Sequence, residues 1–312
     1  MNADGALPQS SPSSPPPKEA TDSAGASWGI TAAGSLGFDD LTTPAGRQRE
    51  VPGGSALYFA LAACRFTRVR VVAAVGSDGS SLLEFLDGAG IDRSSVDQLP
   101  GASYRWRAEH HPSQGVPIYE QQRLGVYVDW RPQLTPAARS SEILFLGSMH
   151  PLRQLEVLRQ CGAAQLVALD TMRDFIASHR EELEQLLIRS DLLFVNEAEL
   201  RALFSSSLRD PVQAARRAVE RWHLQEVILK LGERGAVTVS PSATREFSTA
   251  AGPSVVDPTG AGDALAGGLL GRLAQLRRTD SEAIGEAMAD GARAARAAIA
   301  AFGPRGLISP AS

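Results

Sequence analysis

The segment Val256–Asp263 combines residue types that suit the transfer of a phosphoryl group. It reads Val-Asp-Pro-Thr-Gly-Ala-Gly-Asp and runs into the small, apolar stretch Ala264–Leu270, so we expect a helix to begin near Gly260. The first N–H groups of a helix lack partners and favour an anion, and glycine lets the backbone approach it closely. Asp263 would repel that anion, so a carboxylate at this place suggests a base. A glycine-rich turn in which Asp263 caps the helix explains the pattern equally well.

Four other places in the chain carry polar residues whose structural roles compete with functional ones. Asn196–Glu199 reads Asn-Glu-Ala-Glu, which is typical of a capping box at the start of a helix. Lys230–Ala236 reads Lys-Leu-Gly-Glu-Arg-Gly-Ala, which is typical of a hairpin turn. Asp170 follows an apolar run and either contacts a ligand or caps the next turn. Near the N-terminus, Gly34–Asp40 closes the first predicted strand, where an Asp accepts bonds from a ligand or forms a turn.

Strand-like and helix-like segments alternate along the chain and must position these residues. Strands are predicted at Trp28–Leu36, Arg70–Val75, Glu142–Leu146, Gln165–Leu169, Asp191–Val195 and Glu226–Leu231. Helices are predicted at Leu57–Cys64, Leu152–Gln160, Asp174–Ile188 and Val212–Trp222. The alternation indicates an α/β fold with helices on both faces of a sheet, and ligands of such sheets bind beyond the carboxyl ends of the strands.

The interval at about 103–130 breaks this alternation. Tyr104–Glu109 and, more loosely, Val116–Val128 alternate between polar and apolar residues, which predicts antiparallel strands joined by a turn through His110–Gly115. Two or three inserted strands indicate a small sheet that projects from the main body, and a hairpin packed on the surface is the alternative. His110 and His111 lack Cys or acidic partners at ligand spacing, so we expect an exposed turn rather than a metal site.

Composition narrows the class of protein. The chain has 312 residues, of which 43% are hydrophobic and 21% charged, and these are the proportions of a soluble globular protein. The formal net charge of −4 gives no reason to expect nucleic acid or an anionic membrane as a partner, and no apolar run is long enough to span a bilayer. Two cysteines in a chain of this length favour a reducing, cytoplasmic location.

The first 27 residues differ in composition from the rest. Pro8–Ala26 is rich in Pro, Ser, Gly and Ala and has neither hydrophobic periodicity nor the apolar region of a secretory signal. We expect a disordered tail at 1–27, because such a segment buries too little to offset its ordering entropy. A misassigned start codon would give the same appearance.

Asp257–Asp263 resembles the C-terminal signature of the ribokinase-like (PfkB) family of sugar and nucleoside kinases. Gly34–Asp40, the pair Gly53-Gly54, Asn196–Glu199 and Lys230–Ala236 match other elements of that family in the same order. The resemblance implies one kinase domain at 28–312 with a central, mostly parallel sheet flanked by helices. It also implies that the inserted strands form a small β-sheet lid over the acceptor, which in this family often serves as a homodimer interface.

The resemblance assigns a role to each match. The last Asp of the signature is the catalytic base of the family, here Asp263, and the preceding amides form an anion hole, here those of Gly260, Ala261 and Gly262. Spacing within the family's first motif favours Asp39 over Asp40 as the residue that grips acceptor hydroxyls. The substrate-binding residues implied by the resemblance are Asp39, Gly53, Gly54 and Asp257.

The resemblance also implies ATP and Mg²⁺. In the family, the Asn-x-x-Glu element positions hydrated Mg²⁺, which corresponds to Asn196 and Glu199 here. The nucleotide-binding residues implied in the same way are Asn196, Lys230, Gly232 and Gly235. Many members also bind a monovalent cation such as K⁺ beside the segment that corresponds to Asp257–Thr259.

One departure from the family bears on the acceptor. Many members carry Asn four residues after the second Gly, where this chain has Tyr58, which either stacks on a ring or packs in the core. We expect ATP-dependent phosphorylation of a hydroxyl group on a small sugar or sugar-like acceptor, with an adenosine-type nucleoside as the alternative. A regulator that binds a sugar or nucleotide without catalysis is the second alternative, and the retained Asp263 argues against it.

Overall fold

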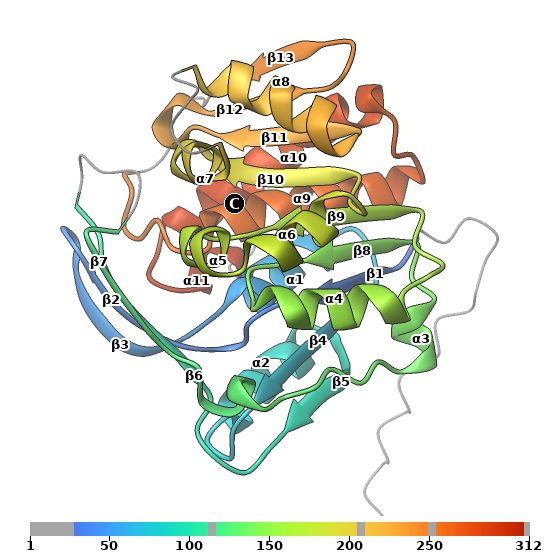
Figure 1. Cartoon of the computed structure of the whole chain (residues 1–312). Helices are drawn as coiled ribbons and strands as arrows, with labels where there is room; N and C mark the ends of the chain where they lie inside the picture. Colours follow the sequence, from blue (N-terminus) through green and yellow to red (C-terminus); the bar gives the residue numbers. More distant parts are fainter. Residues whose placement is uncertain (1–27, 112–116, 205–209, 249–253, 309–312) are drawn as a thin grey trace, which may run out of the picture.

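The computed structural model describes residues 28–111, 117–204, 210–248 and 254–308, so the predicted tail and the predicted turn at 112–115 lie outside the described residues. The central sheet consists of β1 (Ile30–Ala33), β4 (Val69–Val75), β5 (Asp92–Gln98), β8 (Ile143–Leu146), β9 (Leu166–Asp170), β10 (Leu192–Asn196), β11 (Glu226–Lys230), β12 (Ala236–Val239) and β13 (Thr244–Phe247). Their order in space is β13-β12-β11-β10-β9-β8-β1-β4-β5 (Figure 1). In this spatial order, the neighbouring strands from β11 across to β5 pair in parallel. The strand β12 pairs antiparallel with both of its neighbours, β11 and β13.

Helices cover both faces of this sheet (Figure 1). One face packs against α1 (Ser55–Ala63), α2 (Ser80–Gly88), α9 (Ala261–Leu276), α10 (Ser281–Ile299) and α11 (Arg305–Ile308). The other packs against α3 (Pro136–Arg139), α4 (Pro151–Gln160), α5 (Arg173–Ser178), α6 (Arg180–Leu187), α7 (Glu197–Leu203) and α8 (Pro211–Trp222). The predicted α/β class with helices on both faces is confirmed.

The sequence of a single strand explains why there are two cores. In β10, Leu192 and Phe194 belong to the apolar cluster on one face, while Leu193 and Val195 belong to the cluster on the other. Successive side chains of a strand point to opposite faces, so an unbroken apolar run is what a sheet covered on both sides requires. In β9 and β10 the only polar residue is accordingly the last one, Asp170 and Asn196 respectively.

A second sheet projects from the main body at the side of the α1 helix (Figure 1). Its strands are β2 (Gly37–Thr43), β3 (Gly46–Gly53), β6 (Tyr104–Glu109) and β7 (Tyr119–Arg123), in the order β3-β2-β6-β7. The two hairpins are antiparallel, and β2 and β6 join them in parallel. The predicted small sheet is confirmed, but the sequence prediction located only half of it, because Gly34–Asp40 was assigned to the end of the first strand and no strand was predicted at 46–53.

Two predicted elements are shorter than expected. The helix predicted at 174–188 is broken at His179, whose φ of −133° is not helical and whose ring lies 4.1 Å from that of His150. This packing contact between separate helices leaves no trace in hydrophobic periodicity. The strand predicted at 116–128 extends only over β7, and a turn of 3-10 helix, η1 (Gly125–Val128), follows it. There Tyr127 turns inward, and its hydroxyl donates to the carbonyl of Gly34.

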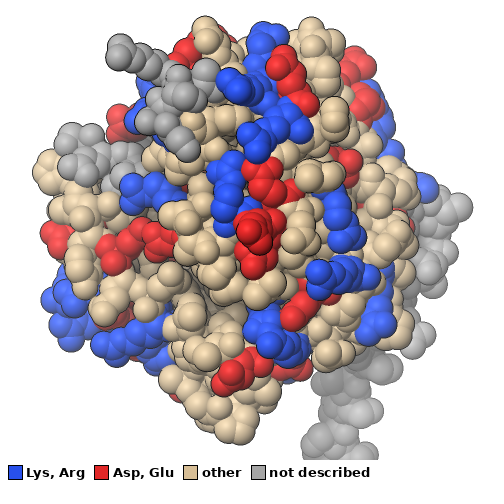
Figure 2. Space-filling view, in the orientation of Figure 1, with Lys and Arg blue, Asp and Glu red and all other residues tan. Residues whose placement is uncertain are grey.

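Charges of both signs are interspersed over the face shown in Figure 2 rather than gathered by sign. Many of them form ion pairs, such as Arg180 with Glu184 at 2.7 Å and Arg234 with Glu197. Exposed pairs of this kind contribute little to stability. Among the described helices, none is both long and apolar enough to cross a membrane.

Candidate active site

Three neighbouring strands of the central sheet end in polar residues. Asp170 ends β9, Asn196 ends β10 and Lys230 ends β11. Asn196 is in register with Lys230, and Phe194 of the same strand is in register with Asp170. Because these strands are parallel, their carboxyl ends share one edge of the sheet, which is where ligands bind in such folds. Asp170, left open by the sequence, therefore lies among the predicted nucleotide-site residues.

The predicted anion turn lies at the start of α9. Gly260 is the N-cap of this helix with φ of 74°, a left-handed conformation that favours glycine. A Cβ atom at Gly260 would overlap the ring of Tyr58, which is buried against the turn. The amide of Ala261 donates to the carbonyl of Pro258 at 3.3 Å, so this N–H helps to shape the turn. The predicted anion-hole segment thus has the backbone form that a helix start requires.

Asp257 organises the chain that leads into this turn. Its side chain is fully buried, and its two oxygens accept hydrogen bonds from the amides of Thr259 at 3.0 Å and Gly303 at 3.1 Å. These bonds tie the turn to the chain beyond α10. Because both oxygens already serve the backbone, contact between Asp257 and the acceptor stays a prediction.

Asp263 lies in the first turn of α9 among other charged side chains. Burial and, to a lesser extent, the negative charge of Asp170 raise the pKa of Asp263 to about 7, although the positive charge of Lys230 opposes them. A carboxyl group that changes its protonation near neutral pH suits a general base. The N-cap of α9 is Gly260 and not Asp263, but the Asp263 carboxylate accepts a hydrogen bond from its own amide in the first turn, so a structural role at the helix start is compatible with that of a base.

Asp39 lies on the second sheet rather than just past the first strand, where the sequence placed it. It sits in β2, in register with Val51 of β3 and Trp106 of β6, and it is 2% exposed. Burial raises the pKa of Asp39 well above its ordinary value, and the charges of Asp257 and Asp263 add to this. The acceptor-side carboxylate and the predicted base therefore lie close enough to influence each other, although they belong to different sheets.

The glycine pair fits closely around this carboxylate. A Cβ atom at Gly53 would overlap the carboxylate of Asp39, and Gly54 is the N-cap of α1 with φ of 100°. Larger residues would displace Asp39 or the start of the helix. The structure thus brings together three of the predicted substrate residues.

Asn196 and Glu199 form the capping box that their spacing predicts. The Asn196 side chain accepts from the amide of Glu199 at 2.9 Å, and Oε2 of Glu199 accepts from the amide of Asn196 at 2.7 Å. Burial raises the pKa of Glu199 to about 7, with Lys230 lowering it and Asp170 raising it. Both residues are fixed at the carboxyl edge of the sheet by bonds within their own helix.

These side chains fit a hydrated magnesium ion. Carboxylate and amide oxygens are the donors that Mg²⁺ prefers. Among the described residues, no three His, Cys, Asp or Glu side chains converge to hold a metal alone. Mg²⁺ usually keeps several of its water molecules in proteins and is shared with the phosphates of a nucleotide. Asn196 and Glu199 would then hold the ion through water molecules.

The two glycines predicted to bind the nucleotide lie in the turn between β11 and β12. Gly232 begins a turn of 3-10 helix, η2 (Gly232–Arg234), and the carbonyl of Gly235 accepts from the amide of Leu231 at 2.8 Å. This turn neighbours the site, since Arg234 pairs with Glu197 of α7. Both glycines hydrogen-bond within the hairpin, and their contact with a nucleotide stays a prediction.

His110 corrects one sequence prediction. It was expected in an exposed turn, but it is half-buried, and Nε2 lies 3.2 Å from the hydroxyl of Thr259 in the anion turn. Burial lowers its pKa, while Asp257 raises it. This hydrogen bond joins the second sheet to the predicted anion turn of the main body. No local pattern reveals it, because the partners are 149 residues apart in sequence.

Trp106 lies beside Asp39, although the sequence did not place it among the predicted site residues. It is in register with Asp39 on the neighbouring strand and so shares its face of the second sheet. Its indole group donates to the carboxylate of Glu120. Alternation of polar and apolar residues placed Trp106 in a strand, but only the pairing with β2 puts it beside Asp39.

Comparison with known proteins identifies the family of this chain. Residues 27–311 match the pfkB family carbohydrate kinases. The chain is 28% identical over 248 residues to a cytidine kinase of Thermococcus kodakarensis, covering 77% of this chain and 87% of the relative. It is 30% identical over 239 residues to a 2-dehydro-3-deoxygluconokinase of Thermoproteus tenax, covering 70% of this chain and 72% of the relative.

A solved structure supports the fold. The nucleoside kinase of Methanocaldococcus jannaschii, a member of the ribokinase family, superimposes with a TM-score of 0.72 at 20% identity, over 90% of this chain and 95% of that one. This superposition supports the architecture described above. With the family match spanning nearly the whole chain, the conclusion is that this protein belongs to the pfkB family of carbohydrate and nucleoside kinases and is a phosphotransferase with an alcohol group as acceptor.

Proposed function

We propose that this protein transfers the γ-phosphoryl group of ATP to a hydroxyl group of a small sugar or sugar-like acceptor. The observation that carries this proposal is the position of Asp263. Its carboxyl group, with a pKa raised by burial to about 7, sits in the first turn of α9, directly after a glycine turn whose helix start favours an anion. A base beside an anion site is the arrangement that phosphoryl transfer needs.

The reaction forms one P–O bond, breaks another and transfers one proton. The acceptor oxygen bonds to the γ-phosphorus, the bond from that phosphorus to the bridging oxygen of ADP breaks, and the acceptor proton passes to Asp263. Amides of Gly260, Ala261 and Gly262 stabilise the charge on the group in transfer. Bound Mg²⁺ supplies charge neutralisation at the nucleotide phosphates. Asn196 and Glu199 would hold that ion through water.

The acceptor side is formed by the second sheet and the start of α1. Asp39 would accept hydrogen bonds from acceptor hydroxyls, and Gly53 and Gly54 would let the acceptor lie against the backbone. Asp257 would assist by holding the turn in place through Thr259 and Gly303. The homodimer interface expected from the resemblance would also involve this sheet.

A nucleoside acceptor is the second candidate, and Trp106 favours it. This indole lies on the same face as Asp39, one strand away, with the Glu120 carboxylate accepting its N–H. Aromatic faces stack well on flat rings. A ribose held by Asp39 would place its base toward that part of the sheet. The likeness to a cytidine kinase and to a nucleoside kinase also supports this candidate.

One experiment separates these candidates. ATP consumption is measured over a panel of sugars, polyols and nucleosides, with the wild type and the Asp39→Asn and Trp106→Ala variants. A sugar acceptor should depend on Asp39 alone, whereas a nucleoside should lose affinity in both variants. If no compound is phosphorylated while ATP still binds, the kinase proposal fails and the non-catalytic regulator is favoured.

A further inference from the structure

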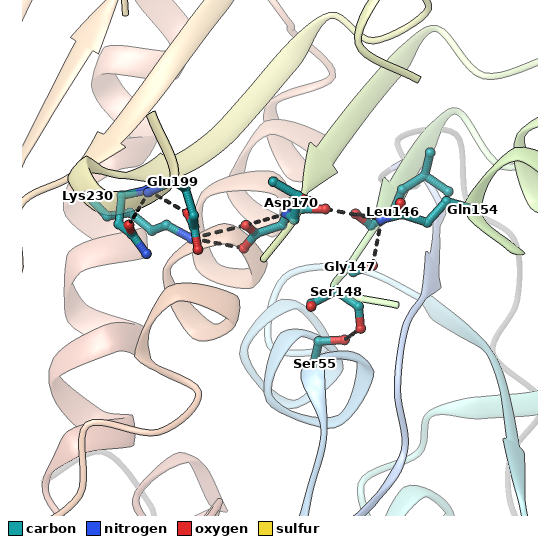
Figure 3. A network of polar contacts seen from close by, with 10 residues as sticks. Ser55, Leu146, Gly147, Ser148, Gln154, Asp170, Glu199 and Lys230 are labelled. Atoms are coloured by element: carbon teal, nitrogen blue, oxygen red, sulfur yellow. Dashed lines mark hydrogen bonds and ion pairs between the residues drawn. The ribbon is translucent and has the colours of Figure 1, made fainter. Parts of the chain in front are cut away.

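The side chain of Lys230 is held by a buried carboxylate. Its Nζ atom lies 3.2 Å from Oδ1 and 3.0 Å from Oδ2 of Asp170, so both carboxylate oxygens accept from the ammonium group (Figure 3). Asp170 is 4% exposed, and the Lys230 side chain is 17% exposed. An ion pair this far from water is attractive only with good geometry and further hydrogen bonds.

Asp170 has those further bonds. Its Oδ1 accepts from the amide of Thr171 at 2.8 Å, and its carbonyl accepts from the Gln154 side chain at 3.1 Å. The same Gln154 amide donates to the carbonyl of Gly147 at 2.9 Å, which ties the end of β9 to the end of β8 (Figure 3). Asp170 is therefore a fixed anchor rather than a mobile surface acid.

The ammonium group held by this anchor lies against the anion turn. A Cβ atom built at Gly262 would be 3.1 Å from Nζ and 3.4 Å from Cδ of Lys230. Burial disfavours the charge on Lys230, but Asp170, Glu199 and Asp263 outweigh it, so its pKa is raised and the group stays cationic. Three carboxylates thus surround one cation beside the proposed anion hole.

We propose that Asp170 is a positioning residue that holds the Lys230 ammonium beside Gly262, where it stabilises negative charge on the phosphoryl group in transfer. This inference rests on the proposed function and adds a fixed cation to the amides of the anion turn. A preorganised cation at that place lowers the barrier without reorganisation during the reaction. It also gives Asp170 a role that neither a ligand contact nor a turn cap provides.

The first test measures binding without turnover. Calorimetry compares Mg²⁺ complexes of ADP and of the non-hydrolysable ATP analogue AMP-PNP, because only AMP-PNP places a γ-phosphoryl group near Lys230. Lys230→Met should weaken AMP-PNP binding at least tenfold and ADP binding by less than threefold. Asp170→Asn should weaken AMP-PNP in the same selective way, and Asp170→Glu should restore part of the loss. Equal losses for both nucleotides would overturn the proposal.

A matched control addresses folding. Asp191→Asn makes the same change at the opposite end of the sheet, where that carboxylate accepts from the amide of Val167 at 2.7 Å, and it should leave both nucleotide affinities unchanged. If Asp170→Asn does not fold, Gly262→Ala replaces it. The added methyl group would press on Nζ and should weaken AMP-PNP selectively while α9 remains intact. Unchanged AMP-PNP affinity in Gly262→Ala would contradict the proposal.

The second test uses the pH dependence of kcat/KM with an acceptor found in the panel. The charged groups that influence Asp263 include Asp170, Lys230, Glu199 and Asp39. Removing the Asp170 charge should lower the pKa of Asp263 and so move the acid limb of the profile, where kcat/KM rises with pH, to lower pH. Removing the Lys230 charge should raise that pKa and move the limb to higher pH. If neither variant shifts the acid limb, the Asp170–Lys230 pair exerts no field at the proposed reaction centre. If the wild type turns over and the acid limbs of the Asp170 and Lys230 variants stay where the wild type has it, this inference alone is overturned. If the wild type does not bind AMP-PNP, the proposed function is overturned as well.

Discussion

Replacing Asp263 with Asn should remove most of the catalytic rate and leave nucleotide binding nearly intact. A positioned general base contributes roughly 10²- to 10⁴-fold to a rate, so we expect kcat to fall by about 10³-fold. Asn keeps the size of the side chain but cannot take the acceptor proton. The ADP affinity measured by calorimetry should change by less than about threefold, because the base faces the acceptor rather than the diphosphate.

The pH profile of the wild type gives the size of the effect independently. With a pKa of about 7, the ionised fraction of Asp263 is about 0.9 at pH 8 and about 0.1 at pH 6. The kcat/KM of the wild type should therefore fall about tenfold between these values. An Asp with the ordinary pKa of 3.8 would stay ionised throughout and give a flat profile.

The assay is steady-state ATP consumption with an active acceptor, since kcat/KM reports the free enzyme. Glu199→Gln is the necessary control, because the pKa of Glu199 is also raised to about 7. It should keep an acid limb, whereas Asp263→Asn should lose it. A flat wild-type profile, or an Asp263→Asn variant with more than about a tenth of the wild-type kcat, would refute the assignment of the base.

The same raised pKa has a consequence for stability with a defined sign. A carboxyl group whose pKa is higher in the folded than in the unfolded protein destabilises the fold as pH rises from about 4 to about 7. Asp263→Asn should therefore raise the melting temperature by on the order of a few degrees at pH 8 and change it little at pH 4. Differential scanning calorimetry at both pH values measures this, and a lower melting temperature at pH 8 would contradict the burial argument.

Two further changes test how the acceptor side is built. Gly53→Ala should raise the acceptor KM by roughly tenfold to a hundredfold and leave the ATP KM unchanged, because the new Cβ would overlap the Asp39 carboxylate; Gly88→Ala, where a Cβ meets open space, is the matched control in the same kinetic assay. His110→Ala and Thr259→Val should each raise the acceptor KM about threefold, since each removes the bond between the second sheet and the anion turn. Their double variant should be no worse than either one, and additive losses would show that the two side chains act separately.

The central sheet was predictable because its strands obey a local rule. The apolar run of β10, Leu192–Val195, is what a strand covered on both faces must have, whatever lies around it. The glycine turn before α9 was predictable for a similar reason, because the eight consecutive residues Val256–Asp263 are enough to predict a helix start that favours an anion. The capping box of Asn196 and Glu199 is equally local.

The second sheet was harder because its contacts join distant segments. Asp39 lies beside Trp106 only through parallel pairing of β2 with β6, and 67 residues separate them in sequence. The bonds from Lys230 to Asp170 and from His110 to Thr259 are of the same kind. Each depends on which strands become neighbours, and periodicity within a strand carries no information about that.

The division of the site between two sheets has a consequence for how its selectivity can change. The residues proposed to contact phosphate end strands of the central sheet or begin α9, whereas Asp39 and Trp106 belong to two hairpins inserted separately into the chain. Substitutions in those hairpins can alter which acceptor is bound without changing the residues proposed for phosphoryl transfer. Because β2 and β6 are hydrogen-bonded to each other, however, new specificity requires compatible changes in both inserts, so transplanting residues 37–53 and 104–123 together should succeed where either alone fails.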